Sequence, residues 1–339
     1  MPGHGAEYTS TEWGPGVTEN PIQLYGLHRL PVQVEELLGR RFAIDWNESD
    51  RDLPLDTLVR LGTEYDGLVT TVTDRIPAPV FDAPGRRARI VANFGVGVNL
   101  IDLAAARRHG VVVTNTPDVL TDCTADLTIA LMLMALRRLG EGERLVRAGQ
   151  WDGWRPTHHL GRRATGLTLG IVGMGRIGQA VARRAYHGFG MRILYAGRSP
   201  APAAIVTDLS ATRQRLDQLF GLADVVSLHC PATPETEGLV DRRRLELMRP
   251  DAVLINTARG ALVDERALAE AIRGGRLGGA GLDVYRDEPG VAAELLALDR
   301  VVLLPHLGSA TIETRTAMGM VVVRNLEAFF SGEEPPNGV

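Results

Sequence analysis

A glycine-rich turn between a strand and a helix constrains this fold more than any other feature of the sequence. Gly173-Met174-Gly175-Arg176-Ile177-Gly178 fits the pattern G-x-G-x-x-G, directly after the apolar run Leu169–Val172 and before the helix-like run Gln179–Ala185. The first glycine permits a tight turn, the second lets backbone approach a pyrophosphate, and the third brings helix and strand close. Free N–H groups at the helix start attract anions. The pattern predicts a dinucleotide site in a parallel sheet.

Short β-rich runs alternate with helix-like segments along the whole chain, which predicts parallel sheets with crossover helices. A chain of 339 residues has room for about two domains. The first series of predicted strands covers Ile22–Tyr25, Phe42–Asp45, Gly67–Thr70, Arg89–Ala92 and Val111–Thr114. The second covers Leu167–Val172, Arg192–Ala196, Asp224–His229, Ala252–Asn256, Gly279–Asp283 and Val301–Leu304. We therefore expect an α/β protein with two Rossmann- or flavodoxin-like, doubly wound parallel-sheet domains.

Two long helical patterns flank the second series. Apolar residues recur at helical spacing over Asp122–Arg147, with Thr121 or Asp122 as the expected N-cap and Gly149 at the end. A helix of this length is expected to bridge domains or subunits. The pattern over Thr311–Phe330 predicts a last helix that returns to complete the first domain.

Composition excludes several classes of function. All 37 basic residues are arginine, so lysine Schiff bases and lysine P-loops are absent. A net charge of −4 gives no overall basic field for nucleic acid or anionic lipid. Cys123 and Cys230 lie far apart in the sequence without a partner motif, which favours a reducing compartment. The pair His158–His159 has no further ligands at a workable spacing, so no metal site is expected. Residues 1–21 lack the regions of a signal peptide and are expected to form a loose extension. No apolar run is long enough for a membrane span, so a cytoplasmic protein is expected.

The end of the second strand after the turn bears on the choice of coenzyme. An NAD site usually carries a carboxylate there, which binds the ribose 2′-hydroxyl. Here Arg192–Tyr195 is followed by Ala196-Gly197-Arg198-Ser199, with no carboxylate to repel a 2′-phosphate. Arg198 and Ser199 can bind that phosphate by charge-assisted hydrogen bonds. The sequence favours NADP(H), with NAD(H) as the alternative.

Three polar residues follow strands of the second series, at the sheet edge where open parallel sheets place their ligands. Arg259 follows Val253–Ala258, Glu288 follows the strand over Gly279–Asp283 after a short loop, and His306 follows Val301–Pro305. A protonated imidazole can give a proton to an oxygen that gains negative charge. A neighbouring carboxylate stabilises that cation, and a guanidinium can grip a carboxylate. The three together predict an active site.

Here the sequence resembles the D-isomer-specific 2-hydroxyacid dehydrogenase family, and most closely its glyoxylate/hydroxypyruvate reductase branch. The resemblance covers nearly the whole chain from Pro21 to Phe330. The motifs that carry it are Asn93–Asn99, Val113–Asp122, Gly173–Gly178, Asn256–Gly260, Gly281–Val284 and Pro305–Thr311.

The resemblance implies an interrupted substrate domain, 1–116 and 307–339, around a cofactor domain at 117–306, with an active-site cleft between them. It also implies a homodimer built around the Asp122–Arg147 helix, with Trp151 or Trp154 reaching the neighbouring subunit. A small 2-oxo acid is the implied partner. Glyoxylate and hydroxypyruvate are the leading substrates.

The resemblance also implies roles for individual residues. Arg259 is the carboxylate and carbonyl clamp, His306 the acid/base and Glu288 its partner. The implied substrate contacts are Val72, Val96, Gly97, Arg259 and His306, with Thr73 at the border of the pocket. The implied cofactor contacts are Thr124, Met174, Gly175, Arg176, Ile177, Gly178, Gly197, Arg198, Ser199, Cys230, Pro231, Thr257, Ala258, Arg259, Asp283, His306 and Gly308.

Two alternatives stay open at this point. One is a D-2-hydroxyacid dehydrogenase for a longer 2-oxo acid, because the sequence does not fix the length of the substrate. The other is a nucleotide-sensing corepressor of the same fold that binds peptides, because such proteins can retain the Arg, Glu and His set. NADPH-dependent reduction of glyoxylate distinguishes the enzyme from the corepressor.

Overall fold

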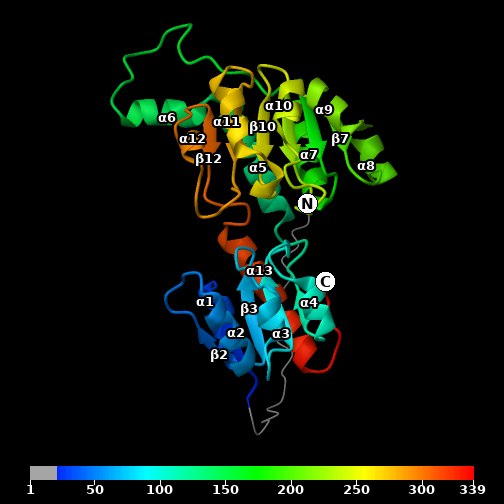
Figure 1. Cartoon of the computed structure of the whole chain (residues 1–339). Coiled ribbons are helices and arrows are strands. Elements are labelled where there is room, and N and C mark those ends of the chain that lie inside the picture. Colours follow the sequence, from blue (N-terminus) through cyan, green and yellow to red (C-terminus); the bar gives the residue numbers. More distant parts are fainter. Residues whose placement is uncertain (1–20) are drawn as a thin grey trace, which may run out of the picture.

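Two lobes, each with its own parallel sheet, make up residues 21–339, the part of the chain that the structure describes (Figure 1). In this computed structural model, the first sheet has five parallel strands in the order β2-β1-β3-β4-β5. They are β1 (Gln23–Gly26), β2 (Ala43–Trp46), β3 (Gly67–Thr71), β4 (Ile90–Phe94) and β5 (Val112–Thr114). The strand order reverses between β1 and β3, and open α/β sheets bind ligands beside such a reversal.

Among residues 21–339, five helices belong to the first lobe, and one of them comes from the far end of the chain. They are α1 (Val32–Arg41), α2 (Leu55–Glu64), α3 (Ala78–Asp82), α4 (Leu103–Arg108) and α13 (Ile312–Phe330). Met318 and Leu326 of α13 share a buried core with Val34 of α1 and Leu24 of β1. A Cβ at Gly319 would lie 2.3 Å from Cγ2 of Val34, so the two helices need a glycine where they cross. The last helix therefore returns to the first lobe, as the sequence predicts.

The second sheet has seven parallel strands in the order β12-β11-β10-β9-β6-β7-β8. They are β6 (Thr168–Val172), β7 (Arg192–Ala196), β8 (Thr212–Arg213), β9 (Val225–Leu228), β10 (Val253–Asn256), β11 (Gly279–Leu282) and β12 (Val301–Leu303). Every residue of β6, β9, β10 and β11 is buried, because helices cover both faces of a parallel sheet. The predicted fold class is confirmed, and every predicted strand is present within two residues at each end. The two-residue edge strand β8 was not predicted.

The remaining helices pack on the second sheet or lie beside it. They are α5 (Thr121–Arg137), α6 (Leu139–Arg147), α7 (Arg176–Phe189), α8 (Ala203–Asp208), α9 (Leu216–Leu222), α10 (Arg242–Leu247), η1 (Gly260–Leu262), α11 (Glu265–Arg273) and α12 (Ala293–Leu296).

The single helix predicted over Asp122–Arg147 is wrong, because the chain breaks at Arg138. That residue takes a left-handed φ of 55°, and its guanidinium makes a two-pronged ion pair with Glu141. Most of α5 packs on the second sheet, with Leu131 and Met132 buried there. The predicted side-chain cap at Thr121 or Asp122 is also wrong, since Leu120 is the N-cap and makes no side-chain cap bond.

Two further expectations concern the N-terminal extension and membrane-spanning helices. The loose extension predicted over residues 1–21 lies outside the described residues except for Pro21. Within residues 21–339, every helix is too short or too polar to cross a bilayer.

Candidate active site

A cavity of about 1400 Å³ opens between the two lobes. Residues that follow strand ends line it from both sides: Val72 after β3 and Val96 after β4 in the first lobe, and Arg259, Asp283 and His306 in the second. The carboxyl ends of both parallel sheets therefore face one space. The active-site cleft expected between the lobes has a structural counterpart in this cavity.

His306 and Glu288 form a directed pair at the edge of the cavity. Nδ1 of His306 lies 2.7 Å from Oε2 of Glu288, and the backbone N–H of Tyr285 donates to Oε1 at 2.9 Å. Burial raises the pKa of Glu288, but the hydrogen bond and charge of His306, the Tyr285 N–H and the charge of Arg259 outweigh it, so this pKa lies below its ordinary value. Glu288 is therefore ionised at neutral pH and holds the imidazole ring by one nitrogen.

The backbone of His306 is held in an uncommon conformation. Its φ is 52°, in the left-handed region that only a few per cent of residues other than glycine adopt, with asparagine, aspartate and histidine the most frequent among them. The N–H of His306 donates to the backbone oxygen of Asp283 at 2.9 Å. The Asp283 carboxylate accepts from the N–H groups of Leu307 and Gly308 at 2.7 and 2.8 Å, and Thr124 donates to the Gly308 oxygen at 2.9 Å. Asp283 and Thr124, both expected as cofactor contacts, thus also fix the loop that carries the histidine.

Arg259 reaches from the second lobe to the first. Its Nε donates to Oδ1 of Asn99 at 3.0 Å, and Nη1 donates to the Ala258 oxygen at 2.6 Å. A Cβ at Gly97 would lie 1.7 Å from Nη2 of Arg259, so the guanidinium sits directly against the Gly97 backbone. Burial lowers the pKa of Arg259 from its ordinary value and the charge of Glu288 opposes this shift, but a guanidinium remains charged.

Hydrogen bonds fix the loop after β4, which contacts this guanidinium at Gly97. The amide of Asn93 donates to the oxygens of Gly95 and Gly97 at 3.2 and 3.0 Å. Asn115 donates to the oxygen of Val96 at 2.9 Å. Val72 packs against the same loop, since a Cβ at Gly95 would lie 1.9 Å from its Cγ1. The expected substrate contacts Val72, Val96 and Gly97 therefore share the first-lobe wall of the cavity, and the Arg259 guanidinium lies against that wall.

The G-x-G-x-x-G turn has the geometry that a dinucleotide phosphate requires. It leads from β6 into α7, whose N-cap Gly175 makes no side-chain cap bond, so no side chain satisfies the first N–H groups of the helix. A Cβ at Gly178 would lie 2.2 Å from the oxygen of Gly173, which only glycine tolerates. A Cβ at Gly175 would meet nothing within 4 Å, so space remains beside the turn. The residues present fit a bound pyrophosphate.

A second loop of the expected cofactor site lies beside this turn. Gly173 donates to the oxygen of Ala196, and Gly197, Arg198 and Ser199 follow directly. Arg213 of β8 donates to the oxygens of Gly197 and Arg198 at 2.8 and 3.1 Å, which fixes the backbone of this loop.

The structure separates the expected site residues into two groups. Those that line the cavity are Val72, Val96, Gly97, Thr124, Ile177, Cys230, Pro231, Thr257, Ala258, Arg259, Asp283, His306 and Gly308. Those outside its lining are Met174, Gly175, Arg176, Gly178, Gly197, Arg198, Ser199 and Glu288. The side chain of Met174 is buried in the core, and Arg176 pairs with Asp118 at 2.7 Å. Burial raises the pKa of Cys230 to about 11, so this thiol is protonated at neutral pH.

Sequence reasoning missed Asn99, which orients Arg259 from across the cleft. Asn99 closes the Asn93–Asn99 motif, so its place in that motif was the available signal.

Comparison with known proteins connects this geometry to a family. The family model for the NAD binding domain of D-isomer specific 2-hydroxyacid dehydrogenases matches residues 129–308. Glyoxylate reductases from Thermococcus kodakarensis and Pyrococcus furiosus are 47% and 46% identical, over 311 and 312 residues. Each alignment covers 91% of this chain and 92% of the relative.

Solved structures agree with these matches. The TT0316 protein from Thermus thermophilus has a TM-score of 0.85 at 46% identity, covering 94% of this chain and all of the other. An NADPH-dependent glyoxylate/hydroxypyruvate reductase from Sinorhizobium meliloti, in complex with NADP and malonate, has a TM-score of 0.82 at 37% identity, covering 94% and 97%. These matches confirm the resemblance that the motifs carry. The chain belongs to the D-isomer-specific 2-hydroxyacid dehydrogenase family, in its glyoxylate reductase branch.

Proposed function

We propose that this protein reduces glyoxylate, hydroxypyruvate and similar small 2-oxo acids to 2-hydroxy acids, with NADPH as the preferred reductant. The observation that carries the proposal is the convergence of the Glu288–His306 pair and Arg259 on one cavity beside a dinucleotide turn. The identity to glyoxylate reductases over most of the chain supports the same reaction.

His306 and Glu288 stabilise the charge that develops during reduction. A nicotinamide dinucleotide held at the Gly173–Gly178 turn would supply the hydride for the 2-oxo carbon. His306, protonated and oriented through Nδ1 by Glu288, gives its Nε2 proton to the oxygen of the substrate as this oxygen becomes negative. Glu288 keeps its negative charge and stabilises the imidazolium.

Arg259 binds the substrate and polarises its carbonyl. Its planar guanidinium can hold a carboxylate with two parallel hydrogen bonds, and it stays charged at any working pH. Asn99 and the Ala258 oxygen hold the guanidinium in place before the substrate arrives, so little reorganisation is needed.

The preference for NADPH rests on the loop after β7. Arg198 and Ser199 offer a charge and a hydroxyl to a 2′-phosphate, and no carboxylate in Ala196–Ser199 repels it. Arg213 supports the loop from β8 by the two hydrogen bonds described above.

Arg198→Ala should therefore raise the KM for NADPH by about tenfold or more, the cost of one charge-assisted contact, while the KM for NADH stays within about twofold. Steady-state kinetics with both coenzymes measure this split. Arg266→Ala, which removes an exposed arginine on α11 of the same lobe, is the matched control. An unchanged KM for NADPH in Arg198→Ala would reject the assigned phosphate contact.

The reaction itself is tested by a coenzyme-oxidation screen of glyoxylate, hydroxypyruvate, pyruvate and phenylpyruvate with NADPH and NADH. We expect the largest kcat/KM for glyoxylate or hydroxypyruvate with NADPH. A preference for phenylpyruvate would indicate a dehydrogenase for longer acids. Turnover with none of the four would contradict an enzymatic role and favour a binding protein.

Gly97→Ala offers a test of the Arg259 position that spares the fold. The new methyl group would displace the end of a flexible arginine rather than backbone, so the protein should fold normally. A displacement of about 1 Å at a positioning group can cost about 10²-fold, and we expect a fall of that order in kcat/KM for glyoxylate. Gly39→Ala on α1, where a Cβ meets nothing within 4 Å, should leave kcat/KM unchanged. Full activity of Gly97→Ala would show that catalysis does not need the observed guanidinium position.

We further propose that one lobe binds the substrate and the other the coenzyme, and that the protein forms a homodimer. In this proposal, 1–116 and 307–339 bind the substrate and 117–306 bind the coenzyme. The dimer is supported by apolar side chains exposed on α6 and the segment after it, which projects from the second lobe (Figure 1): Leu139, Val146, Trp151, Trp154 and Leu160. No residue of α6 is buried within the chain.

A further inference from the structure

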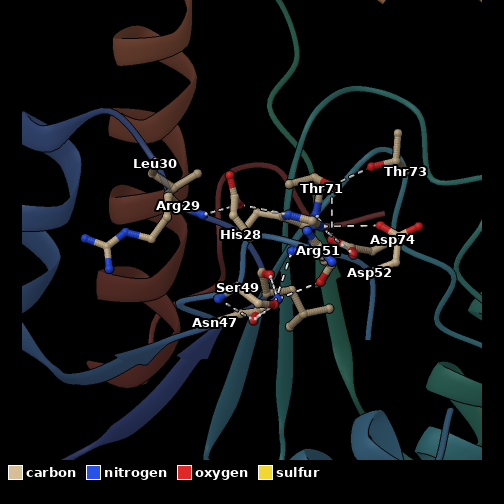
Figure 2. Close-up of polar contacts among 12 residues, drawn as sticks. His28, Arg29, Leu30, Asn47, Ser49, Arg51, Asp52, Thr71, Thr73 and Asp74 are labelled. Carbon is tan, nitrogen blue, oxygen red and sulfur yellow. Dashed lines mark hydrogen bonds and ion pairs between the residues drawn. The ribbon is translucent and has the colours of Figure 1, made fainter. Parts of the chain in front are cut away.

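A histidine and three aspartates gather on the first-lobe side of the cavity, apart from His306 and Glu288. His28 follows β1, Asp50 and Asp52 follow β2, and Asp74 follows β3. His28, Asp50 and the neighbouring Thr71 line the cavity. Three loops at the carboxyl ends of adjacent strands thus meet around one imidazole ring (Figure 2).

The distances on one side of the ring suit a shared cation. Nε2 of His28 lies 3.1 Å from Oδ1 of Asp74 and 3.9 Å from Oδ1 of Asp52. All three ligand atoms lie within 4.8 Å of one another. Ligand atoms bonded at 2.0–2.2 Å to one tetrahedral zinc ion are about 3.3 Å apart. Only Asp52 would need to move, and its side chain is 77% exposed on a surface loop.

His28 and Asp74 already have hydrogen-bond partners on the side that faces away from the proposed ion. Nδ1 of His28 lies 3.1 Å from Oδ1 of Asp50, so a carboxylate fixes the ring and its tautomer. The second oxygen of Asp74 accepts from the N–H and hydroxyl of Thr71 at 2.7 and 3.0 Å, which leaves the first oxygen facing His28. A carboxylate behind a ligating histidine is the usual arrangement at protein metal sites.

The loop that carries Asp50 and Asp52 is held in place before any ion binds. Asn47 is buried, and its amide donates to the oxygens of Leu27 and Arg51 at 2.9 and 2.7 Å. Figure 2 shows the Arg29 side chain pointing away from the histidine. The Arg29 guanidinium forms an ion pair with Glu35 at 2.6 Å.

The charges of the cluster also favour a cation. Asp74 is only 4% exposed, and three carboxylates surround a single imidazole, so the cluster carries an excess of negative charge even when His28 is protonated. Buried carboxylates are costly unless paired or bound to a metal.

We propose that His28, Asp52 and Asp74 bind one divalent transition-metal ion of the Zn²⁺ type, with Asp50 as the outer carboxylate that orients His28. One imidazole with two carboxylates suits Zn²⁺ better than Mg²⁺, because imidazole is a poor ligand for hard cations. The ion joins the three loops at this rim of the cavity. The sequence pattern indicates no metal site, because its only local candidate was His158–His159 and these ligands lie on separate loops.

Titration of tag-free, chelator-treated protein with Zn²⁺ alone in a calorimeter tests the proposal without any activity measurement. We expect one site per chain and a higher Tm with the ion bound. Asp52→Asn should weaken binding at least tenfold, and Asp50→Asn by about 10–100-fold, as removal of an outer partner does at other sites. Asp56→Asn, which removes an exposed carboxylate on α2, should bind as wild type does.

His28→Ala should abolish the site, and thermal unfolding of the metal-free variants shows whether they fold. Because Asp52 is exposed, Asp52→Asn keeps the test valid even if His28→Ala does not fold. No zinc binding, or equal affinity in wild type and Asp52→Asn, would overturn the proposal. The cluster would then be an ion-pair network, in which Asp74 raises the pKa of His28 to about 9.

Discussion

Replacement of His306 should lower kcat for glyoxylate reduction by about 10²–10⁴-fold, the usual contribution of one positioned proton donor. Glu288 holds the ring at 2.7 Å at the edge of the cavity. Because this carboxylate is ionised and has no proton to give, the imidazole is the proton donor of the pair. Because φ at this position is 52°, alanine would add backbone strain. His306→Asn is the better variant, since asparagine tolerates a left-handed backbone. Steady-state kinetics at saturating NADPH measure the loss.

Two further variants make this result specific. Glu288→Gln keeps an acceptor for Nδ1 but removes the charge that stabilises the imidazolium, so we expect a smaller fall in kcat than for His306→Asn. His187→Ala removes an exposed histidine of α7 and should leave kcat unchanged. A kcat for His306→Asn within a few-fold of wild type would contradict the role of His306 as the acid.

Arg259→Ala should lower kcat/KM for glyoxylate by about 10²–10³-fold, the cost of removing one preorganised donor from a developing oxyanion. The loss should appear in both KM and kcat, because the same guanidinium holds the carboxylate and polarises the carbonyl. Asn99→Ala removes the hydrogen bond to Nε but leaves the charge, so a smaller loss is expected.

Arg259→Lys tests whether charge alone suffices. Lysine restores the charge but not the planar fork, so it should rescue only a minor part of the activity. Near-complete rescue by lysine, or a normal KM in Arg259→Ala, would rule out two-pronged binding of the carboxylate. Thermal unfolding of each variant separates these effects from loss of the fold.

The sequence predicted the strands and the shared sheet edge of Arg259, Glu288 and His306 because both depend on local patterns. Buried parallel strands are continuous apolar runs, and residues directly after them must share one sheet edge, which places Arg259 and His306 together. The Arg259–Asn99 contact joins residues 160 positions apart, and no local pattern reports such a pairing. The same holds for His28, which meets residues 22 and 46 positions away.

The break at Arg138 was missed for a different reason. The apolar spacing continues through this position, and arginine has no intrinsic preference for the left-handed conformation that ends α5. Its contacts with Glu141 and with His159, whose Nε2 lies 3.0 Å from the Arg138 oxygen, make up for that cost only in the folded chain. Tertiary contacts therefore decided an element boundary that periodicity alone placed wrongly.

The return of α13 to the first lobe has a consequence for biosynthesis. The apolar side chains of Val34, Leu38 and Ile90 are covered in part by Val322 and Leu326, which the ribosome makes more than two hundred residues later. Until then, the early half of the protein leaves the ribosome with an uncovered apolar face, a surface prone to aggregation. The seven-stranded sheet can close around its own helices first, so the order of folding should run against the order of synthesis.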